Sequence, residues 1–298
     1  MHYRRTFKSI CLAVVLILGA LPILNASGIL PVGAEGNAPI YLPVIASNFR
    51  TGPGKITGKV IDASQPDLPI QNAQVCVDLT NCAFSNASGI YSIDSVLSGG
   101  RSAAVSADKY TSTTSFVEVI TNQTTTLNFA LSPDLAASNV LMRSVVTWSP
   151  NPSWPPEDWP NDLDAYLWMD SQLPRLIYSA DPGDCTVYPY ACLEADFQQG
   201  FGPETIAIGK MTSGATYYFG VYNYNQGFSS SVPPITQTGA RVQVYNQAGI
   251  METFEVPPTG NGDFWYVYKM DDTGNITPVN CITTLSSENL NDLLAQCP

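Results

Sequence analysis

Short stretches in which apolar and polar residues alternate recur through most of this chain and constrain its fold more than any other feature. Residues 56–60 and 75–79 each place an apolar or small residue at every second position, which is the signal of a half-buried β-strand. Clusters of turn residues, such as 64–69, separate the stretches. Further alternating stretches lie at 89–94, 102–107, 115–120, 124–131, 141–148, 163–169, 206–208, 217–224, 240–245, 253–256 and 264–269. The pattern predicts an all-β chain with two antiparallel β-sandwich domains in tandem.

Breaks in this pattern indicate the domain boundaries. The expected segments are a spacer at 35–53, a first β-sandwich at 54–132, a linker at 133–138, a second β-sandwich at 139–285 and a tail at 286–298. The tail differs from the rest because Leu290, Leu293 and Leu294 share one helical face. We therefore expect a short C-terminal helix, with Ser287 as its N-cap.

The first 34 residues have the three parts of a secretory signal peptide. Residues 4–8 carry three basic side chains, and the apolar run at 10–24 follows. This run is shorter than the roughly 20 residues that a membrane-spanning helix needs. Val32-Gly33-Ala34 fits the cleavage pattern, with Ala26-Ser27-Gly28 as an earlier alternative. We predict a protein that is secreted to the extracellular space or cell surface, with no membrane span after cleavage.

Charge and histidine content exclude several function classes. The chain has a formal net charge of −12, which disfavours binding to nucleic acid. Its single histidine is His2, within the predicted signal peptide. The mature chain would then lack the base of Ser-His-Asp and Cys-His catalysis and any histidine ligand for zinc. We therefore expect a protein that is not an enzyme.

Six of the seven cysteines lie beyond the predicted signal peptide, and six cysteines allow 15 pairings. They fall into three close pairs in the sequence, which favours one short loop for each disulfide. The pairs are Cys76 with Cys82, Cys185 with Cys192, and Cys281 with Cys297. Export places them in an oxidising compartment, and the absence of a CxxC motif argues against a metal site.

An ordered set of short motifs in the first predicted domain resembles the carboxypeptidase regulatory-like domain. The set is Gly58-Lys59-Val60, Pro69-Ile70, Ala73-Gln74-Val75, 89–93 (GIYSI), Lys109-Tyr110 and 127–131 (LNFAL). The resemblance implies a transthyretin-like β-sandwich related to starch-binding domains. Lys109 departs from the pattern, because the family usually has glycine before the tyrosine. The ligands of the peptidases that accompany this domain are absent, so no peptidase activity follows.

The second predicted domain resembles a bacterial extracellular β-domain of unknown function. The matching pieces are Thr147-Trp148, Asp162-Leu163-Asp164, 201–205 (FGPET), 239–242 (GARV) and 265–269 (WYVYK). This resemblance implies a fold class and no reaction.

Acidic residues of the second domain form a candidate calcium site. Alternation places Asp162 and Asp164 on one strand face, and Glu194 and Asp196 repeat the arrangement, with Glu204 in a turn. Carboxylate oxygens are the ligands that Ca²⁺ prefers. Alternatively, these residues are the solvated faces of two strands. They could also serve as the acid and base of a histidine-free glycosidase or lyase, the less favoured interpretation.

Aromatic residues suggest a second candidate site. Trp154 and Trp159 flank a proline-rich loop, and Tyr166 and Trp168 lie in the next strand. Exposed aromatic rings stack on the apolar faces of sugars, although most aromatic residues belong to ordinary cores. The leading hypothesis is a non-enzymatic extracellular or cell-surface binding module for a glycan or an extracellular protein. The alternative is a structural spacer in an envelope assembly.

Overall fold

The computed structural model describes residues 29–32, 40–43, 52–149, 162–198, 200–227 and 232–297. The chain forms two units, Met1–Phe49 and Arg50–Pro298. In the first unit, β1 (Ile29–Val32) pairs antiparallel with β2 (Ile40–Pro43). Most of the predicted signal peptide lies outside the described residues, and the signal peptide and the domain boundaries stay predictions.

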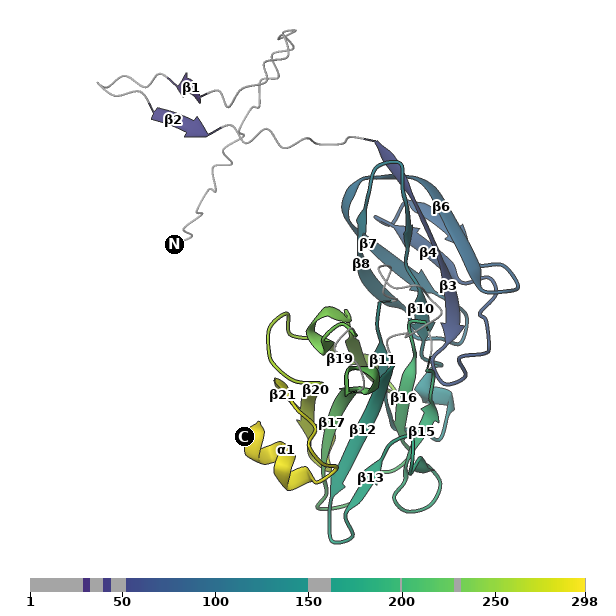
Figure 1. Cartoon of the computed structure of the whole chain (residues 1–298). Helices are drawn as coiled ribbons and strands as arrows, with labels where there is room; N and C mark the ends of the chain where they lie inside the picture. Colours follow the sequence, from purple (N-terminus) through teal and green to yellow (C-terminus); the bar gives the residue numbers. More distant parts are fainter. Residues whose placement is uncertain are drawn as a thin grey trace, which may run out of the picture. The chain divides into compact units, whose positions relative to one another are not determined.

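The first sandwich packs two small sheets face to face (Figure 1). Its strands are β3 (Pro53–Asp62), β4 (Gln74–Val77), β5 (Asn81–Phe84), β6 (Ile90–Leu97), β7 (Gly99–Ser106), β8 (Thr113–Val119), β9 (Thr124–Thr126) and β10 (Phe129–Leu131). One sheet has the order β5-β4-β7-β8, and the other joins β3 to β6, β9 and β10. The predicted alternation places Tyr91 and Ile93 together in the core.

Two backbone features of this sandwich differ from the expectation. Strands β9 and β10 pair parallel with β3, so the sandwich is not wholly antiparallel, because the chain crosses from β8 to the opposite sheet before running beside β3. Lys109 has a φ of +67°, in the left-handed region that favours glycine. This conformation explains why the resembling family has glycine at that position.

The second sandwich has a six-stranded sheet of order β14-β15-β16-β11-β18-β19 and a five-stranded sheet of order β13-β12-β17-β20-β21. Its strands are β11 (Met142–Thr147), β12 (Leu163–Asp170), β13 (Arg175–Ile177), β14 (Gly183–Asp184), β15 (Ala191–Ala195), β16 (Glu204–Ile208), β17 (Thr216–Asn223), β18 (Arg241–Asn246), β19 (Gly249–Glu255), β20 (Phe264–Met270) and β21 (Ile276–Thr283). The inner faces form the largest hydrophobic core of the described residues.

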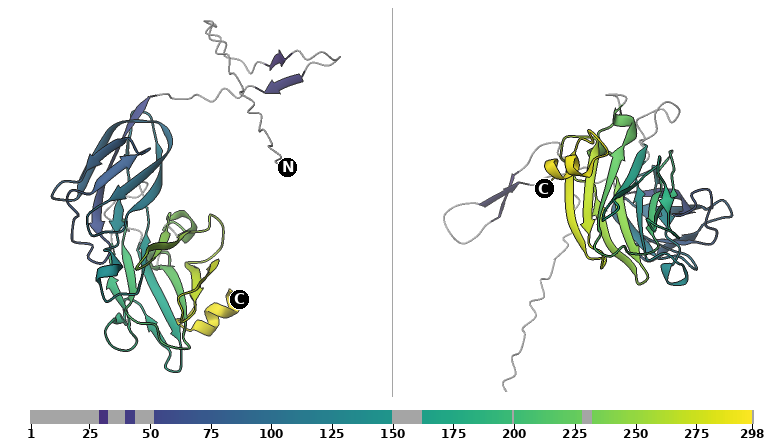
Figure 2. Two further views of the ribbon diagram at one scale, coloured as in Figure 1. Left: turned by 180° about the vertical axis from the view of Figure 1, so that it is seen from behind. Right: turned by 90° about the horizontal axis from the view of Figure 1, so that it is seen from below.

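A short helix, α1 (Leu290–Gln296), covers the outer face of the five-stranded sheet (Figure 2). Its residues Leu290, Leu293 and Leu294 pack on the aromatic residues of that face, as the sequence predicted. Asn289, rather than Ser287, is the N-cap, because the Asn289 side chain accepts a hydrogen bond from the Asn291 amide at 2.9 Å. The prediction of an all-β chain with one short C-terminal helix is confirmed.

The three expected disulfides are formed, joining Cys76 to Cys82, Cys185 to Cys192, and Cys281 to Cys297. The last one ties the end of α1 to β21. No helix within the described ranges is both long and apolar enough to span a membrane.

Buried contacts connect the two sandwiches within the unit Arg50–Pro298. A small apolar cluster includes Ile61 and Ala130 from the first sandwich and Val145 and Tyr245 from the second. Thr205 Oγ1 also donates a hydrogen bond to the Ala63 carbonyl at 2.6 Å. The two sandwiches therefore share a packed interface, and the residues beside it can form one surface.

Candidate functional site

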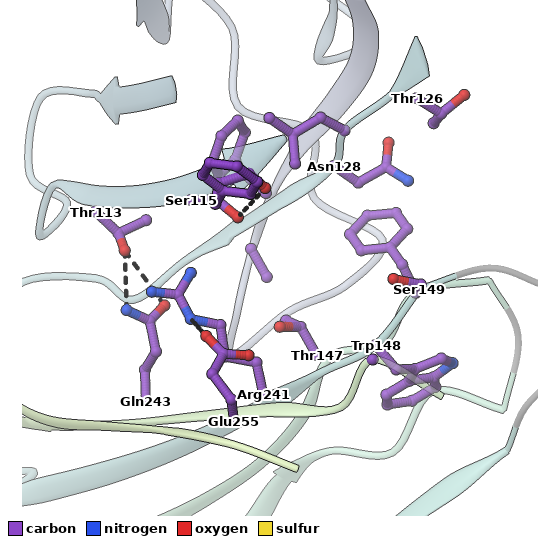
Figure 3. Close-up of a pocket in the computed structure, with 16 residues that line it drawn as sticks. Thr113, Ser115, Thr126, Asn128, Thr147, Trp148, Ser149, Arg241, Gln243 and Glu255 are labelled. Carbon is purple, nitrogen blue, oxygen red and sulfur yellow. Dashed lines mark hydrogen bonds and ion pairs between the residues drawn. The ribbon is translucent and has the colours of Figure 1, made fainter. Parts of the chain in front are cut away.

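A groove of about 420 Å³ lies between the two sandwiches (Figure 3). Strands β8, β9 and β10 and their connections provide one wall, with the side chains of Thr113, Ser115, Phe116, Thr126, Asn128 and Phe129. The facing wall comes from the second sandwich, with the side chains of Thr147, Trp148, Ser149, Phe201, Arg241, Gln243 and Glu255. Hydroxyl, amide and charged groups therefore line most of this groove.

Several of these polar groups are held in place by contacts across the groove. Gln243 Nε2 donates to Thr113 Oγ1 at 2.9 Å, and Arg241 Nη1 donates to the Thr114 carbonyl at 2.9 Å. Arg241 Nε lies 3.1 Å from Glu255 Oε1 in an ion pair. The two hydrogen bonds join the two sandwiches, whereas the ion pair lies within the second, and together they orient the polar side chains before any ligand arrives.

The groove also has an aromatic surface. The ring of Phe116 is 72% exposed, on the edge strand β8. Phe129 and Trp148 also line the groove, but both are buried. An exposed ring beside oriented polar groups can contact a ligand that has both apolar and hydroxyl-bearing faces.

The structure does not present the aromatic residues that the sequence suggested for sugar binding. Tyr166 and Trp168 share one face of β12, but α1 covers that face and both side chains are buried. Trp168 Nε1 donates to the Glu288 carbonyl at 2.8 Å. The two rings are therefore packing residues, and their expected role in stacking is corrected. Trp154 and Trp159 lie outside the described residues.

Three of the predicted calcium ligands converge in the second sandwich. One carboxylate oxygen from each of Asp164, Asp196 and Glu204 lies within 4.8 Å of the other two. Asp164 and Glu204 are buried, whereas Asp196 is exposed. The fourth residue, Asp162, is half-buried, and its Oδ1 atom is buried without a hydrogen-bond partner.

Local strand geometry positions the central carboxylate. Strand β13 pairs only with the end of β12 from Leu167 onward, so the Ala165 amide lacks a strand partner on that side. Glu204 Oε2 accepts a hydrogen bond from this amide at 3.3 Å, and Oε1 accepts one from the Phe197 amide at 2.8 Å. The Glu204 side chain thus bridges two backbone segments and is held inside the cluster.

Burial and mutual repulsion raise the pKa values of three carboxyl groups in this cluster. Burial, with the nearby charge of Asp196, raises the pKa of Asp162 to about 6. Burial, with the charges of Asp162 and Asp196, raises the pKa of Asp164 to about 7. Burial also raises the pKa of Glu204 well above its usual value, although two backbone hydrogen bonds oppose the shift. The four carboxylates are therefore crowded, and no basic side chain of the described residues forms an ion pair with them.

Glu194 does not join the cluster. A register shift between Leu193 and Ala195 interrupts the pairing of β15 with β16, and the strand ends at Ala195. Because the bulge breaks the expected alternation, Glu194 and Asp196 do not share a site. Glu194 instead forms a two-point ion pair with Arg143, at 2.6 Å to Nε and 3.0 Å to Nη2. The expected role of Glu194 as a calcium ligand is corrected to a structural one.

The groove is the feature that sequence reasoning missed. Its walls come from different sandwiches, and Thr113 and Gln243, which meet across it, are separated by 130 residues in the sequence. Polar residues that alternate with apolar ones in a strand are typical of solvated faces, so their pattern carries no signal that they meet.

Residues 55–132 match the model of the carboxypeptidase regulatory-like domain family, and the first sandwich is a domain of this type, as the resemblance predicted. No curated protein matches the chain. Among solved structures, a protein of unknown function is 14% identical, with 49% of this chain and 94% of that chain covered, at a TM-score of 0.37. A candidate carbohydrate-binding protein from Bacteroides uniformis is 11% identical, with coverages of 68% and 98%, at 0.24. A streptococcal ancillary pilin is 10% identical, with coverages of 74% and 66%, at 0.24. The resemblance suggested for residues 139–285 stays a prediction.

Proposed function

We propose that this protein is a non-enzymatic extracellular binding module and that the groove between its two sandwiches binds carbohydrate. The observation that carries the proposal is the lining of the groove, in which oriented hydroxyl, amide and charged groups surround one exposed aromatic ring. Sugars present the complementary surface, with hydroxyl groups around the rim of each ring and an apolar face. The volume of about 420 Å³ falls within the range of small-ligand sites.

The three disulfides support the extracellular location, because such bonds persist in oxidising compartments. The predicted signal peptide agrees with it.

The charge distribution of the groove favours binding over hydrolysis. Glycoside hydrolysis uses two carboxyl groups on either side of the scissile bond. Among the described residues that line the groove, Glu255 is the one carboxylate, and it is paired with Arg241. The cluster of Asp164, Asp196 and Glu204, called the Asp164 cluster below, does not line the groove. The proposed module therefore holds its ligand without cleaving it.

A retention experiment on insoluble polysaccharides and a glycan array tests this function. The purified protein should bind at least one polymer, and Phe116→Ala should reduce the affinity about tenfold, because it removes the exposed stacking ring. Phe84→Ala is the matched control, since Phe84 is also exposed, at 63%, on the opposite edge strand β5 of the same sheet. It should bind like the wild type.

The results of this experiment show separately whether the protein binds carbohydrate and where it binds it. Absence of retention on every polymer would count against a carbohydrate ligand. Retention that survives Phe116→Ala but is lost in Trp154→Ala and Trp159→Ala would move the site from the groove to the predicted loop. Release of shortened sugars from any retained polymer would contradict the non-enzymatic assignment.

A further inference from the structure

We propose that Asp164, Asp196 and Glu204 bind a divalent cation, for which Ca²⁺ is the best fit, and that Asp162 completes the carboxylate set. This site is separate from the carbohydrate groove and does not depend on its ligand. It joins strand β12 to both ends of the segment between β15 and β16.

The spacing of the oxygen atoms suits one shared ion. Calcium–oxygen distances run from about 2.3 to about 2.6 Å, so two ligands of one Ca²⁺ ion can lie as far as about 5 Å apart. The three carboxylate oxygens meet this limit, because all lie within 4.8 Å of one another. Mg²⁺ needs shorter bonds and near-ideal octahedral geometry. Oxygen-only donors disfavour the softer transition metals.

The buried aspartate provides a second observation, independent of the clustering. Asp164 is only 7% exposed, yet among the described residues no group donates a hydrogen bond to its carboxylate and no basic side chain forms an ion pair with it. The Oδ1 atom of Asp162 is also buried without a partner. A buried carboxylate without donors is costly, and a cation held between these oxygens removes that cost.

The cation would also hold one wall of the groove. Asp196 and Glu204 flank a segment that contains Phe201, a groove residue whose carbonyl accepts a hydrogen bond from the Trp148 amide at 3.1 Å. Pinning both ends of this segment to Asp164 restrains Phe201. This consequence rests on the proposed function of the groove, whereas the cation site does not.

Calorimetric titration of the purified full-length protein, stripped with EGTA and dialysed, tests the site directly. We expect CaCl₂ to bind with a Kd between about 1 μM and 1 mM, the range of sensor and extracellular sites, and MgCl₂ to bind more weakly. At a calcium concentration of about 100 times the Kd, the Tm should rise by roughly 5–10 °C. A titration with neither heat nor a Tm shift for either ion would overturn the proposal.

Three single variants locate the site. Asp196→Asn and Asp164→Asn should each weaken calcium binding at least tenfold. Asp196 is exposed, so its variant should fold even if Asp164→Asn does not. Glu252→Gln is the matched control, because it removes one exposed carboxylate on the distant edge strand β19, and its affinity should not change. Unchanged calcium binding in Asp196→Asn and Asp164→Asn would overturn the assignment of these ligands.

The response in EGTA distinguishes a cation site from an ordinary structural cluster. Without the ion, Asp164→Asn should be at least as stable as the wild type, because it removes one of several crowded like charges. With calcium, it should be less stable than the wild type. A loss of stability that is equal in calcium and in EGTA would show a purely structural role. The titration contains no glycan, so failure of the retention experiment would leave its result unaffected.

Discussion

The two sandwiches each bury an aspartate, and they accommodate it in opposite ways. In the first, Asp62 is 3% exposed and accepts hydrogen bonds from the Ser64 amide and hydroxyl, the Gln65 amide and the Tyr110 hydroxyl, at 2.7 to 3.1 Å. In the second, Asp164 is nearly as buried, and no described residue donates a hydrogen bond to it. Its nearest charged neighbours are other carboxylates.

The difference follows from where each residue stands in the chain. Asp62 ends strand β3, so the following turn directs its amides back at the carboxylate. Asp164 lies within strand β12, where adjacent backbone amides are directed toward neighbouring strands. Glu194 shows a third solution, an ion pair with Arg143. The comparison indicates that the charges of Asp62 and Glu194 are balanced by groups of the protein itself. The carboxylates around Asp164 instead need an added cation or protons.

The largest expected loss of stability comes from removing Arg143, the ion-pair partner of Glu194. Arg143→Met should lower the free energy of unfolding by about 3–5 kcal/mol, because it leaves a partly buried carboxylate unpaired. It also removes the donor to Ser132 Oγ at 2.9 Å. Urea denaturation in calcium and in EGTA measures the loss, which should be the same in both. The double variant Arg143→Met, Glu194→Met should recover part of it, and a loss below about 1 kcal/mol would contradict this account.

Removing the Asp62 carboxylate of the first sandwich should cause the next largest loss of stability. Asp62→Ala leaves two backbone amides and the Tyr110 hydroxyl without their acceptor, which should cost about 2–3 kcal/mol. Asp62→Asn is the control, because it keeps one acceptor oxygen and should lose less. Equilibrium urea denaturation measures both. If calcium stabilises the wild type but not Asp62→Ala, the two carboxylate sites are not independent, and the comparison fails.

Gly202→Ala should disturb the Asp164 cluster through the backbone. Gly202 has a φ of +84°, and an added Cβ would lie 2.7 Å from Trp148 Cζ3 and 3.0 Å from the Val146 carbonyl oxygen. We expect a loss of about 2 kcal/mol and weaker calcium binding, because Glu204 follows two residues later. Gly214→Ala is the matched control, since its φ is +75° but nothing lies within 4 Å of the added Cβ. Equal losses in both variants would rule out the contact with Trp148 as a cause.

Local patterns in the sequence predicted the elements, and non-local pairing decided the sites. Alternation predicted strand β3 and the strand that carries Tyr166 and Trp168. These two residues stand two positions apart and so share one face, because side-chain direction in a strand depends on adjacent residues only. The burial of that face depends on α1, which follows more than 100 residues later. Period two therefore identified the face but did not show whether solvent or a helix covers it.

The acidic residues show the same limit, because some of the predicted ligands come together and one does not. The sequence indicated Asp164, Asp196 and Glu204 as candidate ligands because their residue type suits calcium, and the structure brings them together. It also indicated Glu194, which a β-bulge separates from Asp196. A bulge depends on how two strands pair, so one strand read alone does not reveal it.

The smallest expected effect concerns the proton on Tyr110 that is donated to Asp62. Burial, the hydrogen bond to Asp62 and the charge of Asp62 raise the pKa of Tyr110 to about 12, against about 10 in an unfolded chain. The folded protein then keeps a proton that the unfolded chain releases, so stability present below pH 10 is lost as the pH rises from about 10 to about 12.

Tyr110→Phe should make this alkaline loss less steep, by up to one proton in the slope of unfolding free energy against pH. Near pH 7 it should cost no more than about 1 kcal/mol, because Asp62 keeps its three other hydrogen bonds. Urea midpoints measured from pH 7 to pH 11.5 test both expectations. Buried tyrosines such as Tyr268 also have a raised pKa, so the wild type sets the reference slope. An identical slope in the variant would show that Tyr110 releases its proton as readily in the folded protein as in the unfolded chain, and that Asp62 does not depend on this donor.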